Sequence, residues 1–118
     1  MNALGRHILV ELHDCNRDSL NDLKLIRAVM LKAAVDCGAE VLGESFHRFS
    51  PQGVSGVVVI AESHISIHTW PEHGYAAADV FTCGTKVNPI AAADVLIEKL
   101  ESKNHNLTEI QRGVLVTV

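Results

Sequence analysis

Two apolar segments of the β-strand type meet at positions 62 and 63, and this junction constrains the fold more than any other feature. Val57–Ala61 precedes the junction and His64–Trp70 follows it, and both are rich in β-branched residues. Glu62 and Ser63 join them without a Gly or Pro, so no turn is predicted at the junction. Val54–Ile60 is largely apolar on both faces, which predicts a central strand of a sheet.

Two helices are predicted from capping residues and apolar stripes. Ser19 and Asp22 have the spacing of a capping box, and Gly38 is suited to the position just after the first helix. Asn88 is the predicted N-cap of the second helix, with Pro89 in its first turn. The apolar stripes are Leu23, Ile26, Met30, Ala33 and Cys37 in the first helix and Ile90, Ala93, Ile97 and Leu100 in the second.

The remaining segments are predicted strands. They span residues 6–13, 40–49, 75–82 and 107–118, and the first of them alternates apolar and polar residues as a half-buried strand does. Successive strands with two segregated helices predict an α+β fold, a two-layer sandwich of a mostly antiparallel sheet with both helices on one face. The 118 residues are expected to form a single domain, small enough that a homodimer is a natural extension of it.

Composition excludes several functional classes. The net charge is −4 and the ten Lys and Arg residues are scattered, which argues against nucleic acid or an anionic membrane as a partner. No apolar segment is long enough to cross a bilayer, so the cytoplasm is the expected location. The three cysteines, Cys15, Cys37 and Cys83, have wide and irregular spacing, which predicts reduced thiols and no zinc knuckle.

The Glu62-Ser63 peptide bond also has a chemical interpretation. A serine oxygen that lies beside the preceding carbonyl can attack it if the surroundings stabilise the resulting oxyanion, and this would make a self-cleavage site. The structural alternative is a small β-bulge that happens to carry Glu and Ser. Alternation on the following strand places His64, Ser66 and His68 on one face.

The segment from Ser55 to Gly84 resembles the prokaryotic, single-small-chain class of S-adenosylmethionine decarboxylase proenzymes. It reads SGVVVIAESHISIHTWPEHGYAAADVFTCG, and the resemblance is strongest from Glu62 onward. It implies that Ser63 attacks the Glu62 carbonyl, and that β-elimination leaves a covalent pyruvoyl group and two chains, 1–62 and 63–118. No metal is implied.

The resemblance also implies roles for other residues. His68 would be the base and Ser55 a hydrogen-bond donor during self-cleavage, and the pyruvoyl group made from Ser63 would form a Schiff base with the substrate. Cys83 would return a proton to the decarboxylated carbon. Seen alone, His68 is typical of a structural histidine, Ser55 of a turn residue and Cys83 of a core residue at a strand end.

The implied substrate, S-adenosylmethionine, carries a sulfonium cation and an adenine ring, both of which favour aromatic faces. Phe49 matches the stacking position of the family, and Trp70 is a further candidate. Glu72 matches the carboxylate that holds the ribose, and Glu62 would remain near the adenine as a new C-terminus. Seen alone, Phe49 and Trp70 are typical of a core and Glu72 of a solvated turn.

An assembly is expected as well. The family builds each site from two equivalent halves, so one short chain must supply both by symmetry, as a homodimer with four αββα layers. Ser63, Glu62 and Cys83 would come from one protomer, and the partner would supply Phe49, Ser55, His68 and Glu72.

Other functions remain open at this point. The same pyruvoyl machinery decarboxylates arginine or ornithine in some relatives, and a non-catalytic partner subunit could keep the fold. A metal-binding β-protein is a candidate from another class, with His64, His68, Glu72 and His73 as ligands.

Overall fold

A computed structural model describes residues 2–115 and contains six strands and four helical segments. The strands are β1 (Asn2–His13), β2 (Val41–Arg48), β3 (Val54–Ile60), β4 (Ser63–Trp70), β5 (Tyr75–Cys83) and β6 (Asn104–Leu115). The helical segments are α1 (Arg17–Leu20), α2 (Leu23–Asp36), the 3-10 turn η1 (Pro71–His73) and α3 (Pro89–Lys99). The predicted order of elements is confirmed over the described residues, with α1 and η1 as short additions.

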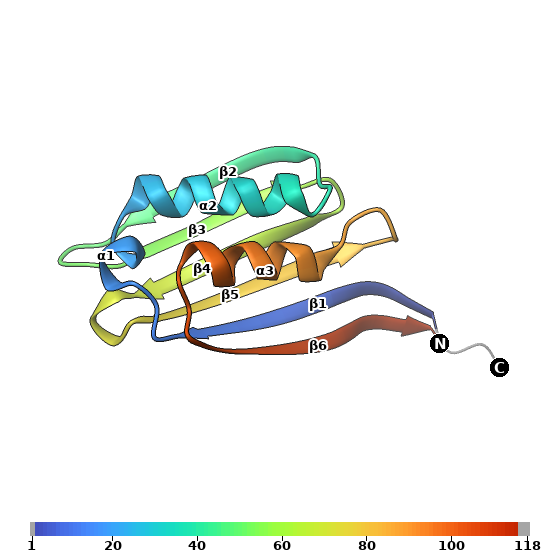
Figure 1. Ribbon diagram of the computed structural model, residues 1–118. Coiled ribbons are helices and arrows are strands. Elements are labelled where there is room, and N and C mark those ends of the chain that lie inside the picture. The colour runs from blue at the N-terminus through green and yellow to red at the C-terminus, as the bar shows by residue number, and fades with distance from the viewer. Residues whose placement is uncertain (1, 116–118) are drawn as a thin grey trace.

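The strands form one sheet in the order β2-β3-β4-β5-β1-β6, and every neighbouring pair is antiparallel. The first strand therefore lies between two strands from the second half of the chain, β5 and β6 (Figure 1). The prediction that Val54–Ile60 is an interior strand is confirmed, because β3 pairs with β2 on one side and β4 on the other.

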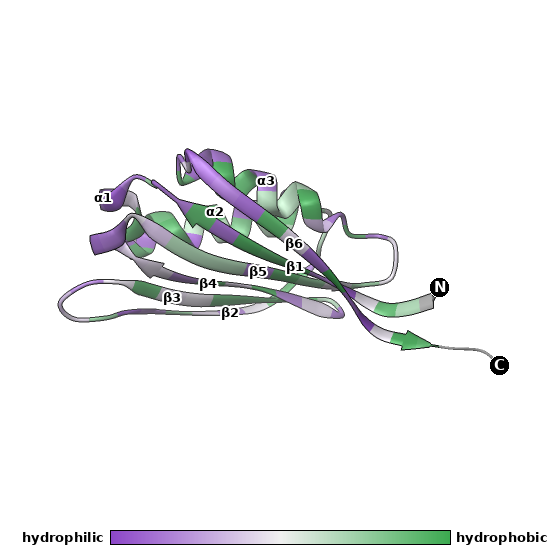
Figure 2. Cartoon of the chain, turned by 90° about the horizontal axis from the view of Figure 1, so that it is seen from below, coloured by the Kyte–Doolittle hydropathy of each residue, from purple (hydrophilic) through white to green (hydrophobic). Residues whose placement is uncertain are grey.

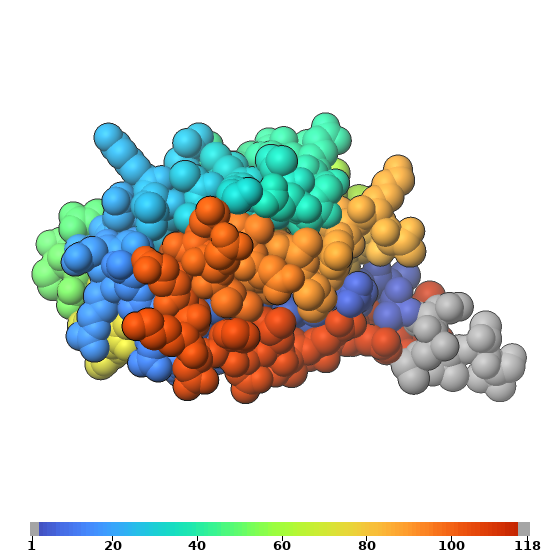
Figure 3. All heavy atoms as spheres, in the orientation of Figure 1, coloured from blue at the N-terminus to red at the C-terminus, as the bar shows by residue number. Residues whose placement is uncertain are grey.

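Both main helices cover the same face of the sheet, as Figure 2 shows. Ile26 and Met30 of α2 and Leu96 of α3 are fully buried against sheet residues such as Ile8 and Ile65. In Figure 3 the side chains of α2 and α3 lie against one another over this face, with β6 along the border. The predicted α+β two-layer architecture is confirmed. None of the described helices is both long and apolar enough to span a bilayer.

The opposite face of the sheet has no helix over it in the part of the chain that the structure describes (Figure 2). Side chains on this open face include Leu9, Val59 and Trp70, which are 37%, 44% and 41% exposed. The face of β3 that carries Val59 is therefore apolar yet exposed in the single chain. A second face rich in apolar side chains is typical of a surface that another layer covers.

The helix termini confirm some capping predictions and correct one. Asn88 caps α3 through its side chain, with Pro89 at the first position, and Gly38 follows α2 with a φ of +88°. The capping box at Ser19 is wrong. The N-cap of α2 is Asp22, whose carboxylate accepts a hydrogen bond from the Leu25 N–H, while Ser19 lies inside α1.

The buried stripe of α3 also differs from the predicted one. Ala92 and Leu96 are fully buried, whereas Ile90 and Ile97 are only partly buried at the border of the core. Ala93 and Leu100 are also fully buried, so the predicted stripe is confirmed at these two positions and is wrong only in leaving out Ala92 and Leu96. Of the predicted C-terminal strand, residues 107–115 belong to β6, and the rest lies outside the described residues.

Candidate active site

The junction between β3 and β4 is a tight turn, which corrects the prediction that no turn occurs there. Ala61 and Glu62 form the turn, and Glu62 adopts a φ of +68°. A left-handed conformation is uncommon for a residue other than glycine and costs on the order of 1–3 kcal/mol. The strain thus lies at the residue whose carbonyl the sequence marks for attack.

Ser63 begins β4 directly after this strained residue. Its hydroxyl donates a hydrogen bond to the carbonyl oxygen of Glu62, and its oxygen accepts one from the Cys83 N–H at 3.0 Å. The nucleophile is therefore held against the adjacent carbonyl by a main-chain donor from β5. This arrangement suits attack by the Ser63 oxygen on the Glu62 carbonyl carbon.

A cavity of about 500 Å³ opens at this end of the sheet. Its walls include Glu62, Cys83, Thr85 and Lys86, so the predicted proton donor and the cleavage turn share one hollow. A hydrogen bond of 3.0 Å from the Asn88 N–H to the Cys37 carbonyl fastens together the loops that enclose it. We call this region, with Ser63, the cleavage end.

The other predicted residues gather at the far end of β4. Ser55 and His68 are directly opposite one another on β3 and β4, and the Ser55 oxygen lies 2.8 Å from His68 Nδ1. Phe49, Trp70 and Glu72 share a cavity of about 320 Å³ with this pair, and we call this region the histidine end. Phe49 and Trp70 are 46% and 41% exposed, so they are not core residues.

The two ends cannot meet within one chain. Ser63 and His68 are separated along an extended strand by ~17 Å, at about 3.3 Å per residue. The cleavage end therefore has the nucleophile and the thiol, and the histidine end has the imidazole, the aromatic rings and the ribose candidate Glu72.

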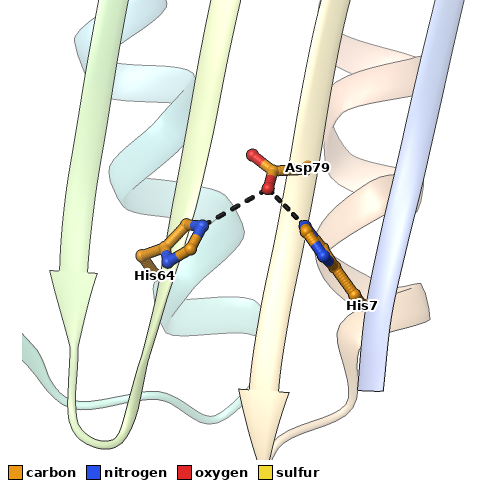
Figure 4. Close-up of side chains that lie close together, drawn as sticks. All are labelled: His7, His64 and Asp79. Carbon is orange, nitrogen blue, oxygen red and sulfur yellow. Dashed lines mark hydrogen bonds and ion pairs between the residues drawn. The ribbon is translucent and has the colours of Figure 1, made fainter. Parts of the chain in front are cut away.

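A third group of polar residues lies on the open face between the two ends, and the sequence did not predict it. Asp79 on β5 lies 2.5 Å from His7 Nε2 and 3.3 Å from His64 Nε2, and it accepts a hydrogen bond from the Ser66 hydroxyl (Figure 4). Burial raises the pKa of Asp79, but the hydrogen bonds from Ser66, His7 and His64 together lower it below its ordinary value. The carboxylate is therefore held ionised.

The tautomer of His7 follows from its neighbours. Arg112 on β6 lies 3.0 Å from His7 Nδ1, and because a guanidinium only donates, Nδ1 must be the acceptor. The proton of a neutral His7 is then on Nε2, which donates to Asp79. His7, His64 and Asp79 are close enough to hold a metal ion, but a metal on Nε2 would need Nδ1 to carry the proton. The contact with Arg112 opposes this.

The alternative metal site predicted from the sequence is wrong. Among residues 2–115, the group with metal-binding geometry is His7, His64 and Asp79, and it does not include His68, Glu72 or His73. His64 lies near the cleavage end, whereas η1, which carries Glu72 and His73, follows the opposite end of β4.

Burial also raises the pKa of other groups in the protein. Burial and a hydrogen bond to Glu11 raise the pKa of Tyr75 to about 12. Burial also raises the pKa of the Cys15 and Cys37 thiols. All three cysteines are free, as predicted.

Comparison with known proteins identifies the family of the chain. The sequence model of the family described as S-adenosylmethionine decarboxylase matches residues 6–113. An S-adenosylmethionine decarboxylase proenzyme of Acetivibrio thermocellus is 59% identical over 114 residues, covering 97% of this chain and 92% of the relative. A proenzyme of the same name from Moorella thermoacetica is 57% identical over 115 residues, covering 98% and 92%.

Solved structures give the same result. The adenosylmethionine decarboxylase of Aquifex aeolicus superposes with a TM-score of 0.91 at 35% identity, over 98% of this chain and 96% of that one. A decarboxylase monomer from Trypanosoma brucei shares the fold alone, with a TM-score of 0.65 at 14% identity over 86% of this chain and 44% of that one. The chain therefore belongs to the S-adenosylmethionine decarboxylase family of enzymes.

Proposed function

We propose that the chain is a proenzyme that cuts itself between Glu62 and Ser63, and that the processed form decarboxylates S-adenosylmethionine. The observation that carries this proposal is the contact of the Ser63 hydroxyl with the carbonyl oxygen of Glu62, at a left-handed turn. The name proenzyme, which the curated relatives bear, supports it.

Processing begins when the Ser63 oxygen attacks the Glu62 carbonyl and the peptide bond becomes an ester. A base then removes the α-proton of residue 63, the electrons form a Cα–Cβ double bond, and the ester oxygen leaves with Glu62 as a carboxylate. Water replaces the amine of the resulting dehydroalanine, ammonia departs, and the chains 1–62 and 63–118 remain.

The pyruvoyl group formed in this way supplies an electrophilic carbonyl for the substrate amine and an electron sink for decarboxylation. Side chains of the protein would bind the substrate and transfer the proton. Cys83 lines the cavity at the cleavage end, which suits a thiol that returns a proton to the substrate carbon. Phe49 and Trp70 offer exposed rings to the adenine and the sulfonium, and Glu72 and Glu62 offer carboxylates.

A homodimer would complete the site. His68 lies ~17 Å along β4 from Ser63 of the same chain, and its partner Ser55 is opposite it on β3, so the two would act on Ser63 of the partner protomer. The exposed apolar side chains of the open face, among them Val59 and Leu9, favour a second copy as the covering layer. The assembly would have four layers, αββα, with two identical composite sites.

Denaturing mass spectrometry tests the processing step. We expect two fragments cut after residue 62, the second blocked to Edman degradation until its carbonyl is reductively aminated. A single intact chain, or an unblocked N-terminal serine, would contradict the proposal. Release of carbon dioxide from carboxyl-labelled S-adenosylmethionine, and none from arginine or ornithine, tests the substrate. The product, S-adenosylmethioninamine, would serve as the aminopropyl donor for spermidine synthesis.

A further inference from the structure

Thr82 on β5 combines two properties that rarely occur together. It is 1% exposed, and within residues 2–115 its hydroxyl is the buried side-chain polar group that has no hydrogen-bond partner. Leaving a buried hydroxyl without a partner is destabilising, whereas an apolar side chain of the same shape would cost nothing. A threonine in such a place therefore needs an explanation beyond packing.

The register of the sheet places this hydroxyl beside the nucleophile. His64 pairs with Phe81 and Ile65 with Val80, so continuing the antiparallel register by one residue puts Ser63 opposite Thr82. Alternation places both side chains on the helix-covered face, because Ile65 and Val80 are buried there. Directly opposite residues in a sheet have Cβ atoms about 4.5–5.5 Å apart.

The present contacts of Ser63 leave a role for a second donor. Its oxygen accepts from the Cys83 N–H, and its proton is directed to the Glu62 carbonyl. In the elimination step, the bond between Cβ and the oxygen of residue 63 breaks, and the electron pair stays on that oxygen as part of the Glu62 carboxylate. Negative charge therefore develops on the atom that Cys83 already contacts.

We propose that the Thr82 hydroxyl is a further catalytic group of self-processing: it donates a hydrogen bond to the oxygen of residue 63 as that oxygen becomes a carboxylate oxygen. Thr82 and the Cys83 N–H would then act as a pair of adjacent donors on β5. Donors aimed at a site of developing charge are effective because they are already oriented before the reaction. This inference rests on the proposed self-cleavage.

Thr82→Val separates this role from a structural one. The variant keeps the shape and loses the unpartnered hydroxyl, so it should unfold at a urea concentration no lower than that of the parent. Its elimination step should be slower by on the order of 10²-fold, the usual cost of losing one such donor. Thr82→Ser keeps the hydroxyl and should process within a few-fold of the parental rate.

The ester intermediate gives a specific signal. Hydroxylamine cleaves an ester but not an ordinary peptide bond, so freshly made Thr82→Val should split into a 1–62 hydroxamate and a fragment with an N-terminal serine. Mass spectrometry detects both. A parent that converts quickly should show little of either.

Thr69 provides the control for stability. It is also a buried threonine, but its Oγ1 accepts from the Val54 N–H at 2.8 Å and donates to the Leu20 carbonyl at 2.7 Å. Thr69→Val should therefore lower the midpoint of urea unfolding, in contrast to Thr82→Val.

Three results would overturn the inference. One is a Thr82→Val variant that processes at the parental rate. Another is a Thr82→Val variant that processes slowly, shows no hydroxylamine-sensitive ester and has a lowered midpoint of urea unfolding. The third is a Thr82→Ser variant as slow as Thr82→Val. A parent that never splits after residue 62 would instead contradict the proposed function, and the inference with it.

Discussion

The two ends of β4 carry different chemical groups. At the cleavage end, Ser63 contacts its electrophile, but its hydrogen-bond partners are a carbonyl and a main-chain amide, neither of which accepts a proton readily. At the histidine end, His68 contacts Ser55, and the nearby hollow is lined by aromatic rings and Glu72. Within one chain, residues that are close in sequence can therefore lie at opposite ends of a strand. His68 follows Ser63 by five positions, yet an extended strand keeps them ~17 Å apart.

The largest effect is expected at the nucleophile of the cleavage end. Ser63→Ala removes the only side-chain oxygen of residue 63, so self-processing should be abolished and decarboxylation with it. Intact-mass measurement should find one chain of 118 residues. Two fragments from this variant would show that another group attacks the backbone, and the assignment of Ser63 would be wrong.

The thiol of Cys83, at the same end, should affect the rate of decarboxylation and not self-cleavage. Cys83→Ala keeps the main-chain donor to Ser63, so processing should continue, but turnover should fall by on the order of 10²–10⁴-fold, as for loss of a positioned acid. Misplaced protonation should also convert residue 63 to alanine, which mass spectrometry of the 63–118 fragment would detect. Normal turnover would make Cys83 a packing residue.

Mixing variants tests whether the two ends of different chains work together. Cys83→Ala damages one end and Glu72→Ala the other, so each homodimer should be inactive. Under subunit exchange, mixed dimers should contain one undamaged site and restore about one quarter of the parental activity. Separately labelled chains serve as the control for exchange, and exchange without recovery would place each site within one chain.

The smallest effect is expected midway between the ends, at Asp79. Its pKa in the folded protein is lowered, so its ionised form stabilises the fold above the ordinary aspartate pKa of about 3.9, and this contribution is lost as pH falls through the lowered value. Asp79→Asn should reduce the free energy of unfolding at pH 7 by less than about 1 kcal/mol, because solvent screens a partly exposed carboxylate.

Urea titrations of the parent and Asp79→Asn at several pH values measure this effect. The difference between the two proteins should shrink as pH falls below the ordinary aspartate pKa of about 3.9, toward the lowered pKa of Asp79. A difference that stays constant with pH would mean that Asp79 acts by packing and not by charge.

Much of the fold could be predicted from local patterns, because strands and helix caps depend on residues that are neighbours in the sequence. The apolar segment Val54–Ile60 and the Asn88-Pro89 cap could be recognised without knowledge of the rest of the chain. The turn at Ala61 and Glu62 was missed because turn signals rely on Gly and Pro, whereas here Glu62 takes the left-handed conformation.

The arrangement of the site, unlike the fold, could not be predicted from local patterns. The residues taken from the family resemblance lie in two groups, and no local pattern separates them into ends. His7 and Asp79 meet across 72 positions of sequence, which depends on the register of β1 against β5. Thr82 is a plain strand residue in the sequence, and only the sheet reveals that its buried hydroxyl is unpartnered.

The position of β1 has a consequence for the processed protein. A cut after residue 62 would leave β1, β2 and β3 in one fragment and β4, β5 and β6 in the other, with β1 inserted between β5 and β6. The fragments would be interlocked, and they could separate only if the ladders on both sides of β1 and the ladder between β3 and β4 broke together. Folding of the uncut chain is unimolecular, whereas refolding of the cut protein would require two fragments to associate. Its rate would therefore depend on concentration.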